Sequence, residues 1–270
     1  MPATQMDSSS RRTFLEQYAI IRRAEGRGSN DPEYYRALPW HDLSGKSGSQ
    51  WAIRARSYYH FERTVLPGIE RNAERPLRIL DLGAGNGWMT NQLRQRGHSP
   101  IALDIFTDER DGLGALRHYA LPLNGVAAEF DVLPFRDGSL DVAIFNSSLH
   151  YSSDYRKTLT EVRRCLRTDG HLVVIDSPVY AAAGHGERMR AERRAHFEAT
   201  YGFRSDSLHS IEYLDEPALA AISTDLGILW KRSYPWYGWR WALRPWRARL
   251  TGQRPPSRFF ILTGQFRSAR

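Results

Sequence analysis

The stretch LRILDLGAGNGWMT, residues 77–90, decides the fold, because an apolar run ends there in a glycine-rich turn and a helical pattern follows. Glycine in such a turn permits positive φ and lets a ligand approach the backbone closely. A dinucleotide fingerprint reads G-x-G-x-x-G, whereas this turn reads G-x-G-x-G and has Trp88 at the place of the third glycine. Asp81 precedes the turn, and its carboxylate would repel a pyrophosphate but attract an ammonium group. The stretch therefore favours a cationic ligand with an adenosine half over a diphosphate.

Outward from this stretch, short apolar runs alternate with helical patterns. The expected strands are 77–82, 100–105, 125–130, 140–146 and 171–178, and the expected helices between them are 89–97, 109–120 and 153–167. Continuous apolar strands separated by helices predict a parallel sheet covered on both faces. Two helices are expected before this region, at 11–24 and at 49–66, the second ending near Pro67 and Gly68. After Pro178 we expect helices at 185–202 and 216–227 and two last strands within 227–236 and 257–266, with a helix interrupted or capped at Pro245 between them.

Carboxylates end the next two strands as well. Asp104 lies about 20 residues beyond the first glycine, the spacing at which an acid reaches ribose hydroxyls. Asp131 ends the third strand and could accept from an adenine amino group, with Phe130 or Val132 along the ring. Each feature alone is equally well explained as a tight turn or a helix cap. All of them in order favour a nucleoside site at the carboxyl edge of the sheet.

Residues 77 to about 177 resemble a class I S-adenosylmethionine-dependent methyltransferase. LDLGAGNGW is similar to the first motif of that family, ALDIF to its ribose-binding strand end, and EFDVLPFRDGSLDVAIFNSSLHY to its adenine loop and fourth strand. EVRRCLRTDGHLVVIDSP resembles the following helix and fifth strand. The resemblance implies a Rossmann-like, seven-stranded, mostly parallel sheet with an antiparallel last strand, helices on both faces and a helical N-terminal cap.

The resemblance also implies S-adenosylmethionine as the cofactor. The residues it assigns are Asp81, Gly83, Ala84, Gly85 and Gly87 to the methionine and ribose, Asp104 and Ile105 to the ribose and adenine, Asp131 and Val132 to the adenine, and Asn146 to the methionine end. The domains expected are a cap or lid at 1–70 and a methyltransferase domain at 71–270. The latter divides into a cofactor-binding core at 77–178, a helical insertion on the substrate side at 179–227, and a strand pair with a basic, Trp-rich connection at 228–270.

A general base is optional in methyl transfer, because the sulfonium is already an activated leaving group. His150 and Tyr151, directly after the fourth strand, are the candidates for catalysis by position. The simpler alternative is that His150 packs near the cofactor. His41, Tyr34 and Tyr35 could close over the site as part of the cap, or form a loop packed on the sheet.

Charge is concentrated at one end of the chain. The formal net charge is +8, and residues 226–270 contain ten Lys or Arg and no Asp or Glu. In WYGWRWALRPWRARL, residues 236–250, tryptophan alternates with arginine, which is typical of an interfacial helix or a stacking platform for single strands. The simpler interpretation is that these tryptophans cover the sheet edge and wall the substrate pocket. The first interpretation allows peripheral contact with an anionic membrane.

Other features narrow the class of protein. Cys165 is the single cysteine, which excludes an internal disulfide and a multi-cysteine metal site, and we expect no metal. An 18-residue apolar window and a secretory h-region are both missing from the sequence, so we expect a cytoplasmic protein. The sequence after the fourth strand, NSSLHY, lacks the N-P-P-[FY] signature and a cysteine, which argues against amide or adenine nitrogen and pyrimidine C5 as acceptors.

The function expected is methyl transfer to a small molecule, with oxygen the first choice of acceptor atom and nitrogen the second. An RNA methyltransferase that uses the basic tail is the alternative within enzymes, although a nucleic-acid partner is not expected. A protein that binds the cofactor without catalysis is a second alternative, and a dehydrogenase is disfavoured by Asp81 and Trp88. The sequence leaves the acceptor and the oligomeric state open.

Overall fold

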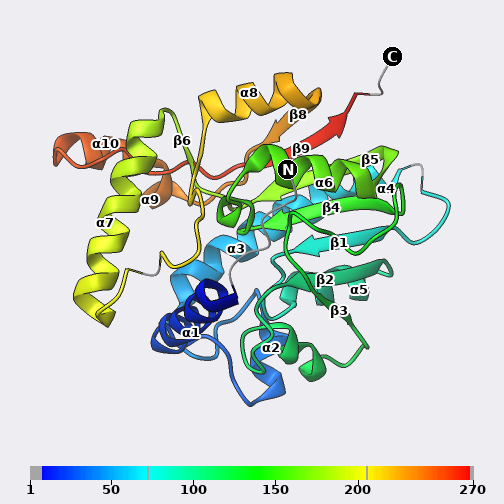
Figure 1. Cartoon of the computed structure of the whole chain (residues 1–270), viewed down its shortest axis with the longest axis horizontal. Helices are drawn as coiled ribbons and strands as arrows, with labels where there is room; N and C mark the ends of the chain where they lie inside the picture. Colours follow the sequence, from blue (N-terminus) through cyan, green and yellow to red (C-terminus); the bar gives the residue numbers. More distant parts are fainter. Residues whose placement is uncertain (1–7, 72, 205, 268–270) are drawn as a thin grey trace.

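The computed structural model describes residues 8–71, 73–204 and 206–267. Its centre is a seven-stranded sheet of order β3-β2-β1-β4-β5-β9-β8, with a separate two-stranded pair, β6-β7 (Figure 1). The strands are β1 Arg78–Leu82, β2 Ser99–Asp104, β3 Asn124–Ala127, β4 Leu140–Asn146, β5 Leu166–Ile175, β6 Val179–Tyr180, β7 Leu214–Asp215, β8 Ile228–Ser233 and β9 Ile261–Phe266. Strands β1 to β5 pair in parallel, and β9 is antiparallel to both β5 and β8. The expected Rossmann-like sheet with an antiparallel last strand is therefore confirmed.

Helices surround this sheet. They are α1 Ser8–Ala24, α2 Pro32–Ala37, α3 Gly48–His60, the π-helical turn η1 Phe61–Val65, α4 Leu66–Glu70, α5 Trp88–Gln95, the short 3-10 helices η2 Leu113–His118 and η3 Leu149–Tyr151, α6 Tyr155–Cys165, α7 Ala183–Tyr201, α8 Glu216–Leu226, α9 Trp239–Ala242 and α10 Arg244–Leu250. None of them, in the part of the chain that the structure describes, is long and apolar enough to cross a bilayer.

The core divides into two layers because strand residues alternate between the two faces of the sheet. On β4, Val142 and Ile144 belong to the cluster that includes side chains of α3, α4 and α5. Ala143 and Phe145 belong to the opposite cluster, with side chains of α6 and α8. All four are fully buried, which explains why the strand reads as a continuous apolar run.

Local signals account for several helix ends. Asp154 caps α6 by accepting hydrogen bonds from the backbone N–H groups of Arg156 and Lys157. Asp215 caps α8 in the same way, and Gly227 ends that helix with φ of 64°. The interruption expected at Pro245 is confirmed: α9 ends at Ala242, and α10 begins at Arg244 with the proline in its first turn.

Two expected helices differ from the structure. The helix expected at 109–120 is only the 3-10 helix η2, because Gly112 before it has extended backbone angles, φ of −114° and ψ of −162°, and therefore interrupts a helix that would begin at 109. The helix expected to end near Pro67 continues through η1 and α4 to Glu70, since Pro67 occupies the first turn of α4, where its missing N–H is tolerated.

Candidate active site

The glycine-rich turn follows β1 and is held against β2. Gly83 and Ala84 donate backbone N–H groups to the carbonyl oxygen of Leu103 at 2.7 and 3.1 Å. Gly83 has φ of 73° and Gly85 of 54°, values that glycine adopts without the cost other residues pay. The turn thus exposes backbone at the carboxyl edge of the sheet, where ligands of α/β proteins bind.

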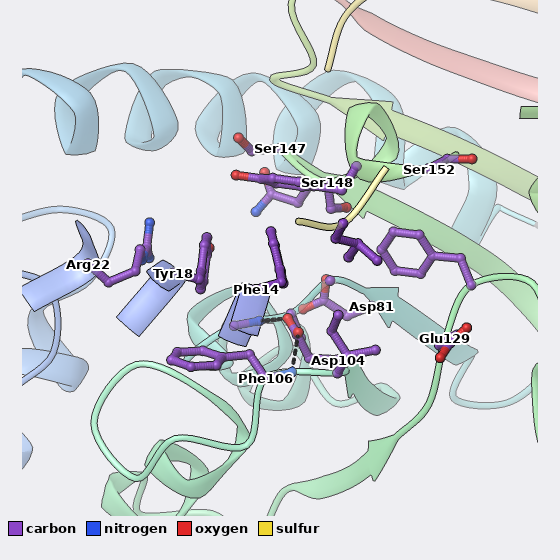
Figure 2. Close-up of a pocket in the computed structure, with 18 of the residues that line it drawn as sticks. Phe14, Tyr18, Arg22, Asp81, Asp104, Phe106, Glu129, Ser147, Ser148 and Ser152 are labelled. Carbon is purple, nitrogen blue, oxygen red and sulfur yellow. Dashed lines mark hydrogen bonds between the residues drawn. The ribbon is translucent and has the colours of Figure 1, made fainter. Parts of the chain in front are cut away.

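Asp104, at the end of β2, is oriented by this turn. Its carboxylate accepts from the backbone N–H of Gly85 at 2.8 Å and from that of Phe106 at 2.9 Å (Figure 2). Burial raises the pKa of the Asp104 carboxyl, and these two hydrogen bonds oppose the shift. The carboxylate is therefore fixed in position before any ligand arrives.

Asp81 is fully buried on β1, one strand away. Thr90 donates to its Oδ2 at 2.7 Å, while Oδ1 has no partner among the described residues. Burial raises the pKa of Asp81 to about 7. A cationic ligand beside Oδ1 would stabilise the charged form of this carboxyl.

The three acids open on one cavity of 460 Å³. Of the residues assigned from sequence, those that line it are Asp81, Gly83, Ala84, Gly85, Asp104, Ile105, Asp131, Asn146 and Tyr151. Gly87, Val132 and His150 are not part of this lining. A Cβ on Gly87 would instead lie 2.1 Å from Cδ2 of Leu116, and Val132 is 63% exposed.

Asp131 has its own ion pair and hydrogen bond. Thr158 donates to its Oδ1 at 2.6 Å, and Nζ of Lys157 lies 3.1 Å from Oδ2. Phe130 lies beside it in the cavity wall and packs edge-on against Phe145, with ring centres 5.3 Å apart. Of the two side chains expected along an adenine ring, the structure places Phe130 in the cavity and Val132 outside it.

The two catalytic candidates occupy different positions. Tyr151 lines the cavity, whereas the His150 ring lies outside the lining and packs on Tyr151 with ring centres 4.6 Å apart. Burial, with Arg193 and Arg54 nearby, lowers the pKa of His150 to about 3. The imidazole is therefore neutral at physiological pH and a weak base.

Helix α1 covers the cavity from the other side. Phe14, Tyr18 and Arg22 point into it at intervals of four residues, opposite Asp104 and Phe106 (Figure 2). Arg22 is held by an ion pair with the buried Asp111. The sequence predicts a helix at 11–24, but the side of that helix that faces the cavity was not identified. The sequence signal for this side is the spacing of Phe14, Tyr18 and Arg22 by four residues.

The residues suggested as a lid lie elsewhere. Tyr34 and Tyr35 are buried but do not line the cavity, and the Tyr35 hydroxyl donates to backbone oxygens of Ser29 and Arg110. His41 is exposed. The cover over the cavity is therefore α1 rather than the segment around α2.

Polar atoms without partners gather around the cavity in two groups. The donors are Nη1 of Arg27, Nε1 of Trp51 and Nη1 of Arg54, and the acceptors are Oδ1 of Asp81 and Oδ1 of Asn146, all buried and without a hydrogen-bond partner within the described ranges. The guanidinium carbons of Arg27 and Arg54 lie 5.2 and 5.0 Å from the Trp51 ring. Burial lowers the pKa of Arg54 to about 10, so the side chain is still charged at neutral pH. Buried polar atoms are rarely left unsatisfied, and this set matches a zwitterion with a carboxylate and an ammonium group.

The Trp-rich connection does not wall this cavity, which corrects the simpler interpretation of residues 236–250. None of them lines it, and Trp236, Trp239 and Trp246 are exposed. Only Trp241 packs inward, between Tyr237 and Phe259. The reason is topological: the connection leaves the sheet between β8 and β9, beyond the strands that border the cavity.

Comparison with known proteins gives a consistent result. Residues 80–174 match the family model described as a methyltransferase domain. An uncharacterized methyltransferase of Mycobacterium tuberculosis is 35% identical over 98 residues, which are 36% of this chain and 39% of that protein. The chain therefore spans about two fifths of the length of this relative. A malonyl-(acyl-carrier protein) O-methyltransferase of Erwinia pyrifoliae is 31% identical over 145 residues, 50% of this chain and 54% of the relative.

A solved structure shares the fold at low identity. It is that of 1,6-didemethyltoxoflavin-N1-methyltransferase from Burkholderia thailandensis, with bound 1,6-didemethyltoxoflavin and S-adenosylhomocysteine. The TM-score is 0.52 at 16% sequence identity, over 98% of this chain and 93% of that one.

Proposed function

We propose that the chain, whose residues 80–174 match a methyltransferase domain, transfers a methyl group from S-adenosylmethionine to a small-molecule acceptor. The observation that carries this proposal is the Asp104 carboxylate, held by Gly85 and Phe106 at the edge of a cavity bordered by the glycine turn. Asp104 lies at the end of β2, about 20 residues after the first glycine of the turn, and this position suits an interaction with the two ribose hydroxyls of an adenosyl group.

The unpaired buried atoms fit the methionine half of this cofactor. Arg54, with Arg27 and Trp51, would receive the carboxylate, and the free Oδ1 atoms of Asp81 and Asn146 would receive the ammonium group. Each pairing satisfies atoms that otherwise remain buried without a partner in the described structure. The same arrangement gives no reason to bind a pyrophosphate, because Asp81 lies where a negative charge would be repelled.

Asp131, Phe130 and Ile105 would surround the adenine. The Asp131 carboxylate is already ordered by Thr158 and Lys157, so it can accept from an amino group without losing rotamer entropy. Phe130 offers a flat apolar contact for the ring.

When bound, S-adenosylmethionine supplies a methyl group on a positively charged sulfur, already activated for transfer. The chain then has to hold the acceptor in line with that methyl group and exclude water. Phe14 and Tyr18 of α1, with Phe106 and Tyr151 across from them, provide apolar walls for this purpose. Ring contacts connect all four, since the Tyr18 ring centre lies 5.6 Å from that of Phe14, 5.1 Å from that of Phe106 and 6.4 Å from that of Tyr151.

The size of the cavity supports a small acceptor. Its 460 Å³ lies within the range of about 300–1,000 Å³ usual for small-molecule sites. We propose oxygen as the first choice of acceptor atom and nitrogen as the second, and the relatives named above include one O-methyltransferase and one N1-methyltransferase.

The test is calorimetric titration of the purified chain with S-adenosylhomocysteine and, separately, with NAD. We expect binding of S-adenosylhomocysteine only, weakened at least tenfold in Asp104→Ala because the ribose loses a charged partner. Asp108→Ala is the matched control, since Asp108 also accepts backbone N–H groups, from Arg110 and Asp111, but does not line the cavity. Binding of NAD, or of neither ligand, would refute the cofactor assignment.

The acceptor is then sought with labelled S-adenosylmethionine in a cell extract that has been separated into small-molecule and RNA fractions. Label in a small molecule supports the proposal. Label in RNA would identify the alternative enzyme class, and binding of the cofactor without transfer to any fraction would identify a non-catalytic protein.

A further inference from the structure

Helices α9 and α10 carry an apolar stripe that the rest of the described chain does not cover. Trp239, Leu243, Trp246 and Leu250 are 76%, 58%, 68% and 85% exposed. They recur at intervals of four, three and four residues, and Leu243 between the two helices keeps helical backbone angles. At about 100° per residue the four side chains fall within a sector of roughly 60° on one side of the helix axis.

The opposite side of the same axis packs on the protein. Trp241 contacts Tyr237 and Phe259, Arg244 lies over the Trp241 ring and donates to the carbonyl oxygen of Ser257, and Ala248 is buried. The stripe therefore faces outward because the helix is fixed from behind. The packing of the opposite side therefore fixes the orientation of the stripe toward solvent.

Arginines flank the stripe on both sides. Arg240 and Arg247 lie on one flank and Arg249 on the other, and none of the three forms an ion pair within residues 8–71, 73–204 and 206–267. No carboxylate close in the sequence neutralises these arginines, since residues 226–270 contain no acidic side chain. Other arginines of this region are neutralised by acids from elsewhere, as Arg254 is by Glu192 and Arg258 by Glu216.

We propose that α9 and α10 form a docking surface for an anionic phospholipid membrane. Tryptophan and leucine at the centre would enter the boundary between headgroups and acyl chains, where the amphipathic indole ring is preferred. The flanking arginines would contact the phosphate groups. Trp236, whose ring centre lies 5.0 Å from that of Trp239, extends the apolar area at one end.

The charge pattern selects lipid over other occupants. A second copy of this chain would bring two sets of unpaired arginines together, and an acidic protein partner would not require four large apolar side chains in one narrow row. A single-stranded nucleic acid needs a groove that follows its backbone, whereas this surface is the outer side of a helix. Figure 1 shows α9 and α10 at the end of the molecule toward which β1 and β4 run. Asp81 on β1 and Asn146 at the end of β4 line the cavity. The proposal does not depend on the chemistry of methyl transfer.

The experiment is flotation of the full chain with phosphatidylcholine vesicles, with and without phosphatidylglycerol, at low and high salt. We expect binding to the anionic vesicles that decreases as salt screens the arginines. Trp239→Ser with Trp246→Ser should weaken binding at least tenfold, while the control pair Leu43→Ser with Leu121→Ser, which changes exposed leucines elsewhere, should not. Arg240→Gln with Arg247→Gln should weaken it roughly thirtyfold, against no change for Arg71→Gln with Arg136→Gln.

Tryptophan quenching by brominated lipid provides a readout on the unaltered chain, so the test does not depend on the folding of a variant. Quenching on vesicle binding supports insertion of the stripe. The absence of flotation, or equal binding by the tryptophan variant, would overturn the proposal. So would a concentration-dependent dimer that the tryptophan variant abolishes, or RNA binding through the same residues without lipid binding.

Discussion

A Cβ placed on Gly83 would lie 2.4 Å from the Cβ of Ser148. The glycine turn after β1 and the turn after β4 therefore touch each other, and both border the cavity. The Ser148 hydroxyl also donates to the carbonyl oxygen of Leu82 at 2.5 Å, which fixes this contact. The two strand ends can approach so closely only because one of them carries no side chain.

We expect Gly83→Ala to lower the free energy of unfolding by about 2–4 kcal/mol. This loss combines the cost of a positive φ at alanine with the cost of overpacking its Cβ against Ser148. Gly97→Ala separates the two causes, because Gly97 has φ of 92° but open space around its Cβ position. That control should lose only about 1–2 kcal/mol. Urea unfolding of both variants measures the difference, and equal losses would contradict the close contact.

Affinity for S-adenosylhomocysteine should increase with pH through neutrality. Burial raises the pKa of Asp81 from 3.8 to about 7. The ligand-free fold therefore loses stability as pH rises between these two values. Over the same range the carboxylate form of Asp81, which attracts an ammonium group, becomes populated. The affinity should rise by up to about tenfold per pH unit below 7 and level off above it.

Asp81→Asn isolates this contribution from that of Asp104, whose carboxyl pKa is also raised by burial. In this variant the affinity should be lower and nearly independent of pH in calorimetric titrations. A slope that persists in Asp81→Asn would assign the dependence to another group.

Arg54→Gln should have opposite effects on stability and on binding. It removes a charge on a half-buried side chain whose Nη1 atom is buried and which forms no ion pair among the described residues, so the ligand-free protein should gain about 1–3 kcal/mol in thermal unfolding. Affinity for S-adenosylhomocysteine should fall at least tenfold, whereas affinity for methylthioadenosine, which lacks the carboxylate, should be unchanged.

Arg56→Gln is the matched control on the same helix, since Arg56 donates to the carbonyl oxygen of Tyr237 and does not line the cavity. Equal losses for both ligands in Arg54→Gln would show that Arg54 shapes the whole cavity and does not receive a carboxylate.

His150→Ala and Tyr151→Phe distinguish the two catalytic candidates once an acceptor is known. With a pKa of about 3 and no place in the cavity wall, His150 should matter less than tenfold for turnover. Tyr151→Phe should have the larger effect if the tyrosine hydroxyl contacts the acceptor. A loss of 10²-fold or more in His150→Ala, with cofactor affinity unchanged, would instead make His150 the general base.

The place of three assigned residues in the cavity wall could be predicted from sequence because they stand at strand ends. Parallel strands deliver Asp81, Asp104 and Asn146 to one edge of the sheet whatever the loops do. The proposed acceptor walls on α1 and the proposed carboxylate-binding Arg54 on α3 lie on helices outside this strand pattern. Which face of a helix turns toward a cavity depends on tertiary packing, and a single sequence does not encode it in a recognisable motif.

The pairing of β6 with β7 was missed for a related reason. Each strand has two residues, and the partners are separated by the whole of α7. A run of two residues is too short to show the alternation of apolar and polar residues that indicates a strand. The helix expected at 109–120 is only a 3-10 helix at 113–118. The apolar spacing of ERDGLGALRHYA is helical, but Gly112 and Gly114 lower helix propensity and approach neighbouring backbone.

The register between β8 and β9, with Ser233 opposite Ile261, means that residues 234–260 are the loop of a hairpin. A tight turn of two residues can join such strands, and the entropic cost of a longer connection grows only slowly with its length. The sheet therefore places no limit on what is inserted there. Exchange of this one loop for another would replace the proposed membrane surface and change no residue that lines the cavity, since none of residues 234–260 lines it.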